Sequence, residues 1–546
     1  MRGVSNLRTT VTGGALGAVS GLLSGFTALA VAEAVASLVR PRTGPVTVVG
    51  GAAIDRTPAP VKDFAIRTFG EDDKLVLQLG ILAALGVLGV GLGLLALRRR
   101  RAGSAGVLLF GLVGAAAALS RPDARGAADT LPSLAGAVAG AVALYILAGK
   151  ATAGADAQSG AQSGGGADAQ SGARAGGAFG GGWSRRGFLT AASVTAVAAT
   201  GAGLLGRTLS GRRGRGAVAS REAVVLPAPA SPAAPLPAGA QLKVAGISPF
   251  TTPNGDFYRV DTALAVPMVD AGTWRLRIHG TGVARPRSYT VRELLARPLV
   301  ERDITLTCVS NEVGGPYAGH ARWLGVPLGD LLRECGVRPP SGGGRADQLV
   351  ARSVDGMTLG SPVEDVMDGR DALLAVGMNG EPLPFAHGFP VRMVVPGLYG
   401  YVSACKWIED IELTTFDRYD PYWVRRGWAR RAPVKTQARI DTPKPFARPG
   451  GAEVMVAGVA WAQHRGIIRV EVRVDDGPWE DADLAAQDSV DTWRQWSYPW
   501  RPTPGGHTLT VRATDGTGAV QTEDRTRTVP DGASGRHSVF VTAGPP

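Results

Sequence analysis

Residues 75–97 are almost wholly apolar, contain no charged side chain and are followed directly by four arginines, Arg98 to Arg101. About twenty consecutive apolar residues form a helix long enough to span a bilayer, and Lys and Arg collect at the cytoplasmic ends of such helices. This stretch therefore predicts a transmembrane helix, and it separates the first part of the chain from any ordinary soluble domain.

Three further apolar stretches lie near it. Residues 13–39 are interrupted only by Glu33, whereas residues 105–119 and 134–148 are shorter and rich in Gly and Ala. Such helices pack closely inside a membrane, and interfacial helices are the alternative for the two short stretches. We therefore expect residues 1–150 to form an all-α region of about four transmembrane helices.

Basic residues predict how these helices are oriented. Residues 1–8 and the arginines after residue 97 belong on the cytoplasmic side, and an even number of spans returns the chain there at Lys150. The segment 40–74 is then outside. Because Glu33 is the one charged residue within an apolar stretch, a simple anchor is favoured over the alternative of a transport or sensing domain.

The next three segments connect this region to the rest of the chain. Residues 151–183 consist mainly of Gly, Ala, Ser and Gln, which predicts a flexible linker. Residues 184–210 begin Ser-Arg-Arg-Gly-Phe-Leu, which is typical of a twin-arginine export signal or of a fifth membrane helix with a stop-transfer flank. Residues 211–242, rich in Ala and Pro, predict an extended spacer. Both interpretations of 184–210 place the later domains on the extracytoplasmic side of the cell membrane.

The net charge of +12 does not indicate a nucleic-acid-binding protein, because many arginines lie in short clusters beside the apolar stretches. All six histidines lie from His279 onward, so metal or acid–base chemistry is expected in the second half. The three cysteines, Cys308, Cys335 and Cys405, match no zinc-binding spacing. Cys335 lies near a predicted helix end and is interpreted as a packing residue.

Two soluble domains are predicted. In residues 243–425 short strand patterns alternate with helical pieces: Thr290 and Glu293 have capping-box spacing, and Asn379-Gly380 indicates a hairpin. This mixture predicts an α+β domain. Residues 426–546 contain alternating strand patterns separated by Gly, Pro and Asp, which predicts a small β-sandwich of immunoglobulin type.

The α+β domain contains a cysteine in a distinctive setting. Residues 304–307 alternate as a strand that ends at Cys308, and a loop with two glycines and His320 follows. A buried hydrophobe that ends a strand is the plain alternative for this thiol. His387-Gly-Phe-Pro-Val-Arg392 and Cys405-Lys406-Trp407 follow later in the chain.

These three motifs, in this order, resemble the sulfite oxidase family of molybdopterin enzymes from about residue 254 to the C-terminus. The resemblance implies a sulfite-oxidase-type domain followed by the sandwich, with a Mo-molybdopterin cofactor whose metal is bound by Cys308. The sandwich would form a homodimer contact. A thiolate is a soft metal ligand, and an anionic pterin pyrophosphate requires cationic and N–H partners. The residues implied for binding the cofactor are Asn254, Phe257, Tyr258, His387, Arg392, Ser403, Ala404, Cys405 and Lys406.

The same resemblance implies oxygen-atom transfer to or from a small sulfur-containing or oxo substrate. Asn311 is followed by Glu312, where sulfite-oxidising relatives have an arginine pair, so positive charge near the substrate would come from other residues. The candidates are Arg259, Arg322 and Arg465, the last in a loop where His464 is the alternative. Sulfite oxidation, sulfoxide reduction and a non-catalytic binding module that has lost its metal all stay open.

Electrons are expected to leave through a separate carrier protein or a quinone. With no histidine before His279 and no CxxCH motif, the chain offers the membrane helices no haem ligands. The predicted protein is thus a multi-pass membrane oxidoreductase in contact with lipid, without haem.

Overall fold

The computed structural model describes residues 2–58, 61, 64, 68–69, 73–121, 123–160 and 185–544. The chain divides into two compact units, Met1–Arg215 and Gly216–Pro546. The long helix α7 (Arg185–Glu222) begins in the first unit and ends in the second.

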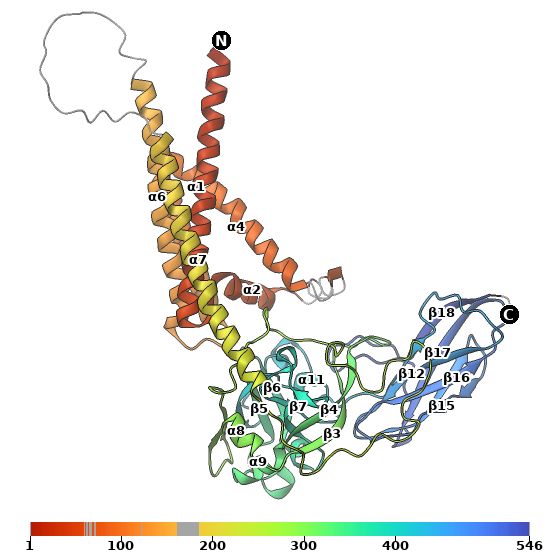
Figure 1. Cartoon of the computed structure of the whole chain (residues 1–546). Helices are drawn as coiled ribbons and strands as arrows, with labels where there is room; N and C mark the ends of the chain where they lie inside the picture. The colour runs from red at the N-terminus through yellow and green to blue at the C-terminus, as the bar shows by residue number, and fades with distance from the viewer. Residues whose placement is uncertain are drawn as a thin grey trace, which may run out of the picture. The chain divides into compact units, whose positions relative to one another are not determined.

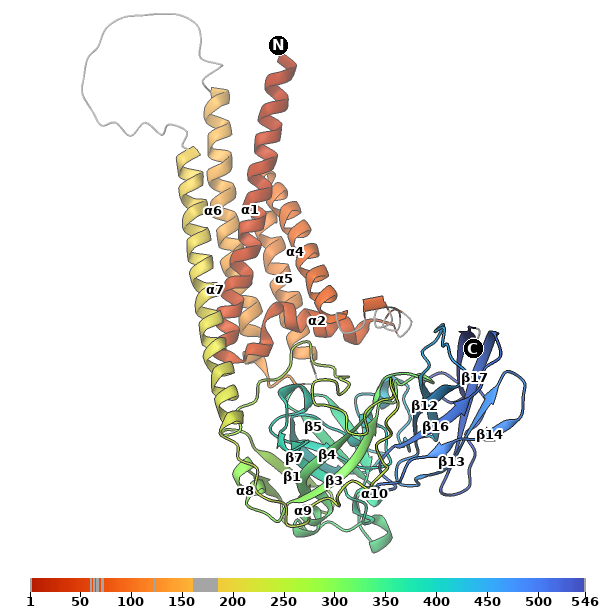
Figure 2. The same ribbon diagram turned by 45° about the vertical axis from the view of Figure 1, so that its right-hand side comes forward.

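The first unit is all-helical in its described part (Figures 1 and 2). Five segments are long and apolar enough to cross a membrane, which is compatible with four helices followed by a fifth. Their bounds are 14–39, 74–98, 100–120, 127–152 and 187–222. The helices and 3-10 turns before α7 are α1 (Arg2–Val39), η1 (Pro41–Thr43), α2 (Pro45–Arg56), α4 (Asp73–Arg98), α5 (Arg100–Ser120), η3 (Ala127–Thr130) and α6 (Leu131–Gly160).

Glycines set how closely these helices pack. A Cβ atom built on Gly21 of α1 would lie 1.9 Å from the carbonyl oxygen of Gly89 in α4, and one on Gly93 would lie 2.0 Å from that of Gly17. Small residues at such crossings let two backbones approach, as in membrane helix pairs. The Gly/Ala-rich composition of the apolar stretches therefore has a packing reason.

The structure differs from the sequence prediction at the start of the linker region. Helix α6 continues to Gly160, into the predicted linker, because the Ala-rich sequence after Lys150 allows a helix that has already begun to propagate. The rest of the predicted linker, residues 161–183, lies outside the described residues.

The predicted spacer 211–242 does not extend freely. Helix α7 runs to Glu222, and the chain beyond it packs along the second unit: Ala230 N donates to Leu299 O at 2.7 Å, and Glu301 N donates to Ser231 O at 2.9 Å. The exposed edge of a strand offers unpaired N–H and C=O groups, which the Ala/Pro-rich segment satisfies here. Length and composition alone do not reveal such a partner.

The second unit contains four sheets. Two five-stranded sheets have the orders β2-β1-β10-β5-β6 and β3-β4-β7-β8, with β9 paired to β7, and two four-stranded sheets have the orders β11-β12-β16-β15 and β14-β13-β17-β18. The strands of the first pair are β1 (Leu276–Gly280), β2 (Arg287–Tyr289), β3 (Val300–Thr307), β4 (Ala318–Pro327), β5 (Gln348–Ser353), β6 (Thr358–Pro362), β7 (Leu373–Met378), β8 (Glu381–Pro382), β9 (Arg392–Val394) and β10 (Ile408–Thr414).

Short helices connect these strands, and the remaining strands build the second pair of sheets, drawn in blue in Figure 1. The helices and turns are α8 (Val291–Leu295), α9 (Leu328–Glu334), η4 (Pro340–Gly342), α10 (Val363–Met367), η5 (Phe385–His387), α11 (Gly400–Ser403) and η6 (Val424–Arg426). The later strands are β11 (Gln437–Thr442), β12 (Val454–Trp461), β13 (Ile467–Val474), β14 (Trp479–Asp481), β15 (Asp483–Leu484), β16 (Arg494–Trp500), β17 (Gly505–Asp515) and β18 (His537–Ala543).

Local predictions in this unit are confirmed. Thr290 and Glu293 form the capping box that begins α8. Asn379 and Gly380 both have positive φ between β7 and β8, as a two-residue hairpin turn requires.

The predicted boundary between residues 425 and 426 does not separate the two hydrophobic cores. Ala432 and Val434 pack in the core of the α+β part, as do Trp461 and Trp493 from the later sheets. A second core lies between the two four-stranded sheets. The later sheets, called the sandwich below, are therefore joined to the α+β part by buried side chains.

Candidate cofactor-binding site

Strand β3 carries Cys308 to the end of its sheet. The strand pairs with β4 up to Thr307 and Ala318, and the N–H of Cys308 then donates to Tyr317 O at 2.9 Å. The cysteine is 9% exposed, and its burial raises the pKa of the thiol. At neutral pH the free thiol is therefore protonated, and a bound metal ion would be needed to hold it as a thiolate.

The loop after Cys308 is held by its own polar groups. The side-chain oxygen of Asn311 accepts from Tyr317 N at 2.8 Å, and Ser310 N lies 3.4 Å from the Cys308 sulfur. Glu312 is exposed. Asn311 thus shapes the loop, while the carboxylate that follows it lies in solvent.

Arg392, at the start of β9, is the most deeply buried cation of the predicted set. It is 5% exposed, Nη1 donates to His387 O at 3.2 Å, and its guanidinium carbon lies 4.9 Å from the Trp323 ring centroid. Nε has no hydrogen-bond partner, and within the described part of the chain no carboxylate forms an ion pair with it. Burial lowers the pKa of Arg392 to about 10. A buried cation without a counter-charge is costly, so this position favours an anionic group.

His387 lies next to Arg392 in a neutral state. Its Nε2 donates to Asn254 O at 2.9 Å, and the residue is 5% exposed. Burial, followed by the charge of Arg392, lowers the pKa of His387 to about 4. The imidazole is therefore an uncharged hydrogen-bonding group at neutral pH.

Lys406 shares one carboxylate with Arg259. Lys406 Nζ lies 3.1 Å from Asp261 Oδ2 and donates to Val260 O at 3.1 Å, and Arg259 Nε lies 3.4 Å from the same Asp261 oxygen. The Asp261 side chain is 5% exposed. Two of the predicted cations are thus partly neutralised by a residue that the sequence prediction did not include.

A single cavity collects most of the implied cofactor residues. From the predicted set, its lining includes Phe257, Tyr258, Cys308, His387, Arg392, Ala404 and Lys406. The polar and aromatic residues that the prediction missed are Asp261, Thr262, Ser310, Ser353, Asp355, Tyr401, Trp407, Trp423 and Trp428. The Tyr-Trp-Val-Arg-Arg-Gly-Trp sequence at 422–428 was the available signal for the last two.

Three implied residues lie behind this lining. The amide nitrogen of Asn254 donates to Glu381 at 2.7 Å, Ser403 Oγ donates to Leu398 O at 2.9 Å, and Cys405 is fully buried with its thiol pKa raised by burial. All three adjoin lining residues, because Asn254 O accepts from His387 and the other two flank Ala404 in the chain.

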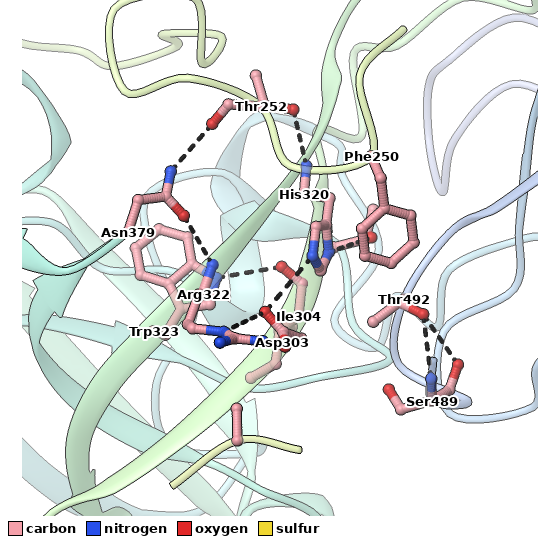
Figure 3. A network of polar contacts seen from close by, with 12 residues as sticks. Phe250, Thr252, Asp303, Ile304, His320, Arg322, Trp323, Asn379, Ser489 and Thr492 are labelled. Carbon is pink, nitrogen blue, oxygen red and sulfur yellow. Dashed lines mark hydrogen bonds and ion pairs between the residues drawn. The ribbon is translucent and has the colours of Figure 1, made fainter. Parts of the chain in front are cut away.

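Arg322 and Arg465 lie outside the cavity lining. Figure 3 shows Arg322 against Asp303, with an N–O distance of 2.6 Å, in a network that includes His320, Asn379 and Thr252. Arg465 pairs with Asp515 at 2.9 Å. Each arginine is thus already bound to a carboxylate.

The cavity suits an anionic, thiolate-binding cofactor. It is lined by a buried cysteine, by a buried arginine with an unused N–H and by a neutral histidine whose N–H is already donated to Asn254 O, and its walls carry several aromatic rings. Soft thiolate ligands and charge-assisted N–H donors are what a metal–pterin group with a phosphate tail requires. The residues present therefore fit such a group.

Residues 263–423 match the family described as "Oxidoreductase molybdopterin binding domain". Mitochondrial sulfite oxidase of Mus musculus is 31% identical over 288 residues, covering 45% of this chain and 52% of that protein. Sulfite oxidase of Gallus gallus is 31% identical over 290 residues, covering 46% and 62%, and nitrate reductase [NADH] 1 of Oryza sativa subsp. japonica is 34% identical over 197 residues, covering 32% and 21%.

The chain thus spans about half the length of the curated relatives it matches. Among solved structures, the sulfane dehydrogenase SoxCD from Paracoccus pantotrophus covers 54% of this chain and 82% of its own, with 25% identity and a TM-score of 0.47. The chain therefore carries a molybdopterin-binding domain of the molybdenum oxidoreductases, related in sequence to sulfite oxidases.

Proposed function

We propose that the protein is a membrane-anchored molybdopterin oxidoreductase that transfers an oxygen atom at a Mo centre bound by Cys308, with a small sulfur compound such as sulfite as substrate. One observation carries the proposal: buried Cys308 lines the same cavity as buried Arg392, whose Nε has no partner. A buried guanidinium without an acceptor for its N–H is costly, and a buried thiol becomes a thiolate only when it binds a cation such as a metal ion, so the pair favours a ligand that offers both.

Different residues of the cavity would bind different parts of this cofactor. Cys308 would bind the metal, and Arg392 and Lys406 would face the anionic pterin and its pyrophosphate, with the neutral ring of His387 contacting the cofactor beside them. When bound, the cofactor supplies the two-electron chemistry of oxygen-atom transfer, and the protein supplies binding, orientation and charge. The rings of Trp407 and Trp428 would exclude water from the lined space.

A second reaction, reduction of an organic sulfoxide, is favoured by the charges around the cavity. Among the described lining residues Arg392 is the only arginine, and Arg259, Arg322 and Arg465 each pair with a carboxylate. Asp261 pairs with Lys406 within the lining, and Asp355 adds a further negative charge, which disfavours a small dianion. A non-catalytic binding module is disfavoured, because Cys308, His387 and Arg392 line one cavity in this chain.

The location and partners are part of the same proposal. The five apolar helices would anchor the chain, with the catalytic unit on the extracytoplasmic side. The sandwich would be of immunoglobulin type and would contribute to a homodimer. Electrons would pass to a separate carrier protein or a quinone, since the membrane helices contain no histidine to bind haem.

The test compares both reactions in the full chain, purified from a host that makes molybdopterin. Sulfite oxidation with an artificial electron acceptor and methionine sulfoxide reduction with an artificial donor are measured for the wild type, Cys308→Ser and Cys335→Ser. Cys335 is also buried but lies outside the cavity, so it is the matched control. We expect Cys308→Ser to lose at least about a thousandfold in kcat and Cys335→Ser to retain activity. Equal activity of Cys308→Ser and the wild type would show that Cys308 is not the metal ligand.

A further inference from the structure

Strand β3 is the edge strand of its sheet, yet its last residues are not open to solvent. Thr305 and Thr307 are each 2% exposed. The outward N–H and C=O groups of a buried edge need hydrogen-bond partners from elsewhere in the chain. Which segment supplies them determines what fixes the strand end that carries Cys308.

These partners come from two loops of the sandwich. Thr305 N donates to Asp491 O at 2.9 Å, and Thr305 Oγ1 accepts from Trp493 N at 2.8 Å. Gln463 Nε2 donates both to Thr305 O at 3.0 Å and to Thr307 Oγ1 at 2.9 Å. Gln463 follows β12, and the other two residues precede β16.

Gln463 is the side chain that joins both threonines. It is 1% exposed, its amide nitrogen is used twice on β3, and its Oε1 has no partner. An unsatisfied buried oxygen costs about 1–3 kcal/mol, so packing alone does not favour glutamine at this position. The two hydrogen bonds that Gln463 donates to β3 offset the cost of its unsatisfied oxygen.

We infer that Gln463 is a positioning residue for Cys308: by holding Thr305 and Thr307 it fixes the end of β3 and so the direction in which the thiol enters the cavity. Gln463 does not line the cavity, so it acts through the strand and does not touch the reacting atoms. The sandwich would then be part of the catalytic architecture, in addition to any role in dimer formation. What the thiol binds rests on the proposed function, whereas the hold on β3 does not.

The first test is hydrogen exchange of the full native chain without cofactor. Gln463→Met conserves volume and removes both donors, and we expect amides in residues 304–308 to exchange about tenfold faster than in the wild type. Gln521→Met is the matched control: Gln521 is 3% exposed and donates to Gly535 O at 2.8 Å inside the sandwich, away from β3. The control should change exchange near residue 535 and leave 304–308 unchanged.

The second test uses the cofactor-loaded chain. Gln463→Met should keep the Mo content, lower kcat with KM little changed, and shift the thiolate-to-metal absorption band, because the thiol is held in a wider range of directions. Gln463→Glu, which also lacks the two donors, should show the same shift. An exchange rate over 304–308 equal to that of the wild type, or an unshifted band, would overturn the inference.

The two tests separate this inference from the proposed function. A wild-type chain that binds no Mo would contradict the proposed function, while the exchange experiment would still report on the hold on β3. Faster exchange over 304–308 in Gln521→Met as well would mean general loosening of the sandwich, and the specific role of Gln463 would be rejected.

Discussion

At the scale of single residues, Arg392 is expected to favour cofactor binding while lowering the stability of the cofactor-free chain. It is buried without a carboxylate partner, so in the metal-free chain its charge costs free energy. We expect Arg392→Met to bind little cofactor and yet, without cofactor, to unfold at a temperature equal to or above that of the wild type. Calorimetry and Mo analysis measure the two effects.

Arg439→Met is the control for that substitution. Arg439 is 8% exposed and pairs with buried Asp441 at 2.7 Å, so its removal leaves an uncompensated carboxylate and should cost about 3–5 kcal/mol. If Arg392→Met destabilised the metal-free chain to the same extent, Arg392 would already be compensated within the fold. That result would contradict its proposed role in binding an anionic ligand.

His537 predicts how stability depends on pH. Its Nδ1 accepts from Ile440 N at 3.0 Å, and burial, followed by Arg439, lowers the pKa of His537 to about 4. Between the unfolded pKa of about 6.5 and pH 4, the unfolded chain binds a proton that the folded chain does not. The contribution of His537 to the free energy of unfolding is therefore fully present above pH 6.5 and is lost as the pH is lowered to about 4.

His537→Gln keeps an acceptor near Ile440 and removes the titration. Guanidinium unfolding at pH 7 and pH 5 should show a smaller loss of midpoint in this variant than in the wild type. His387, whose pKa is lowered to about 4 by burial, acts in the same direction and is present in both proteins. An identical pH dependence of the two proteins would mean that His537 titrates normally in the fold.

At the scale of elements, the loop after β3 depends on Gly314. Its φ is +80°, and a Cβ atom there would lie 2.2 Å from Cδ2 of His537. Gly314→Ala should therefore destabilise the chain by about 2 kcal/mol or more and lower its Mo content. Guanidinium unfolding and metal analysis are the measurements.

Gly427→Ala is the control that introduces backbone strain without a steric contact. Gly427 also has positive φ, at +90°, but nothing lies within 4 Å of the added carbon. This substitution should lower the free energy of unfolding by about 1 kcal/mol, from backbone strain alone. A Gly314→Ala variant no less stable than Gly427→Ala would show that the contact between this loop and the sandwich is not tight.

Elements with a local cause were predictable from the sequence. The strand that ends at Cys308, the capping box of α8 and the hairpin at Asn379-Gly380 follow from alternation, cap chemistry and positive φ. Cys308, His387 and Arg392 were found because their motifs are short and sequential, and the structure brings them to one cavity.

Features that depend on distant partners were not predictable. Asp303, which pairs with Arg322, is placed by strand register, and Asp261 lies beside Lys406 although 145 residues separate them. The pairing of residues 230 and 231 with residues 299 and 301 likewise depends on an edge that composition does not reveal. An arginine or lysine in the sequence therefore predicts a positive charge but not the carboxylate with which it pairs in the fold.

At the scale of the whole molecule, the arginine pair that begins α7, Arg185 and Arg186, predicts the route of export. Arg185→Lys combined with Arg186→Lys should leave the second unit inside the cell, because twin-arginine export carries domains already folded around a cofactor. Protease accessibility on spheroplasts measures this, with Arg212→Lys and Arg213→Lys as the control pair. Unchanged exposure of the unit would indicate insertion by another route.

The central claim is that the Cys308 cavity holds a molybdenum cofactor, and elemental analysis of the full chain tests it most directly. Protein purified in detergent from a molybdopterin-producing host should contain about one Mo per chain, and Cys308→Ser should contain less or hold it more weakly. A well-folded wild-type chain without Mo from such a host would contradict the account and favour a binding module in which Cys308 is a buried structural residue.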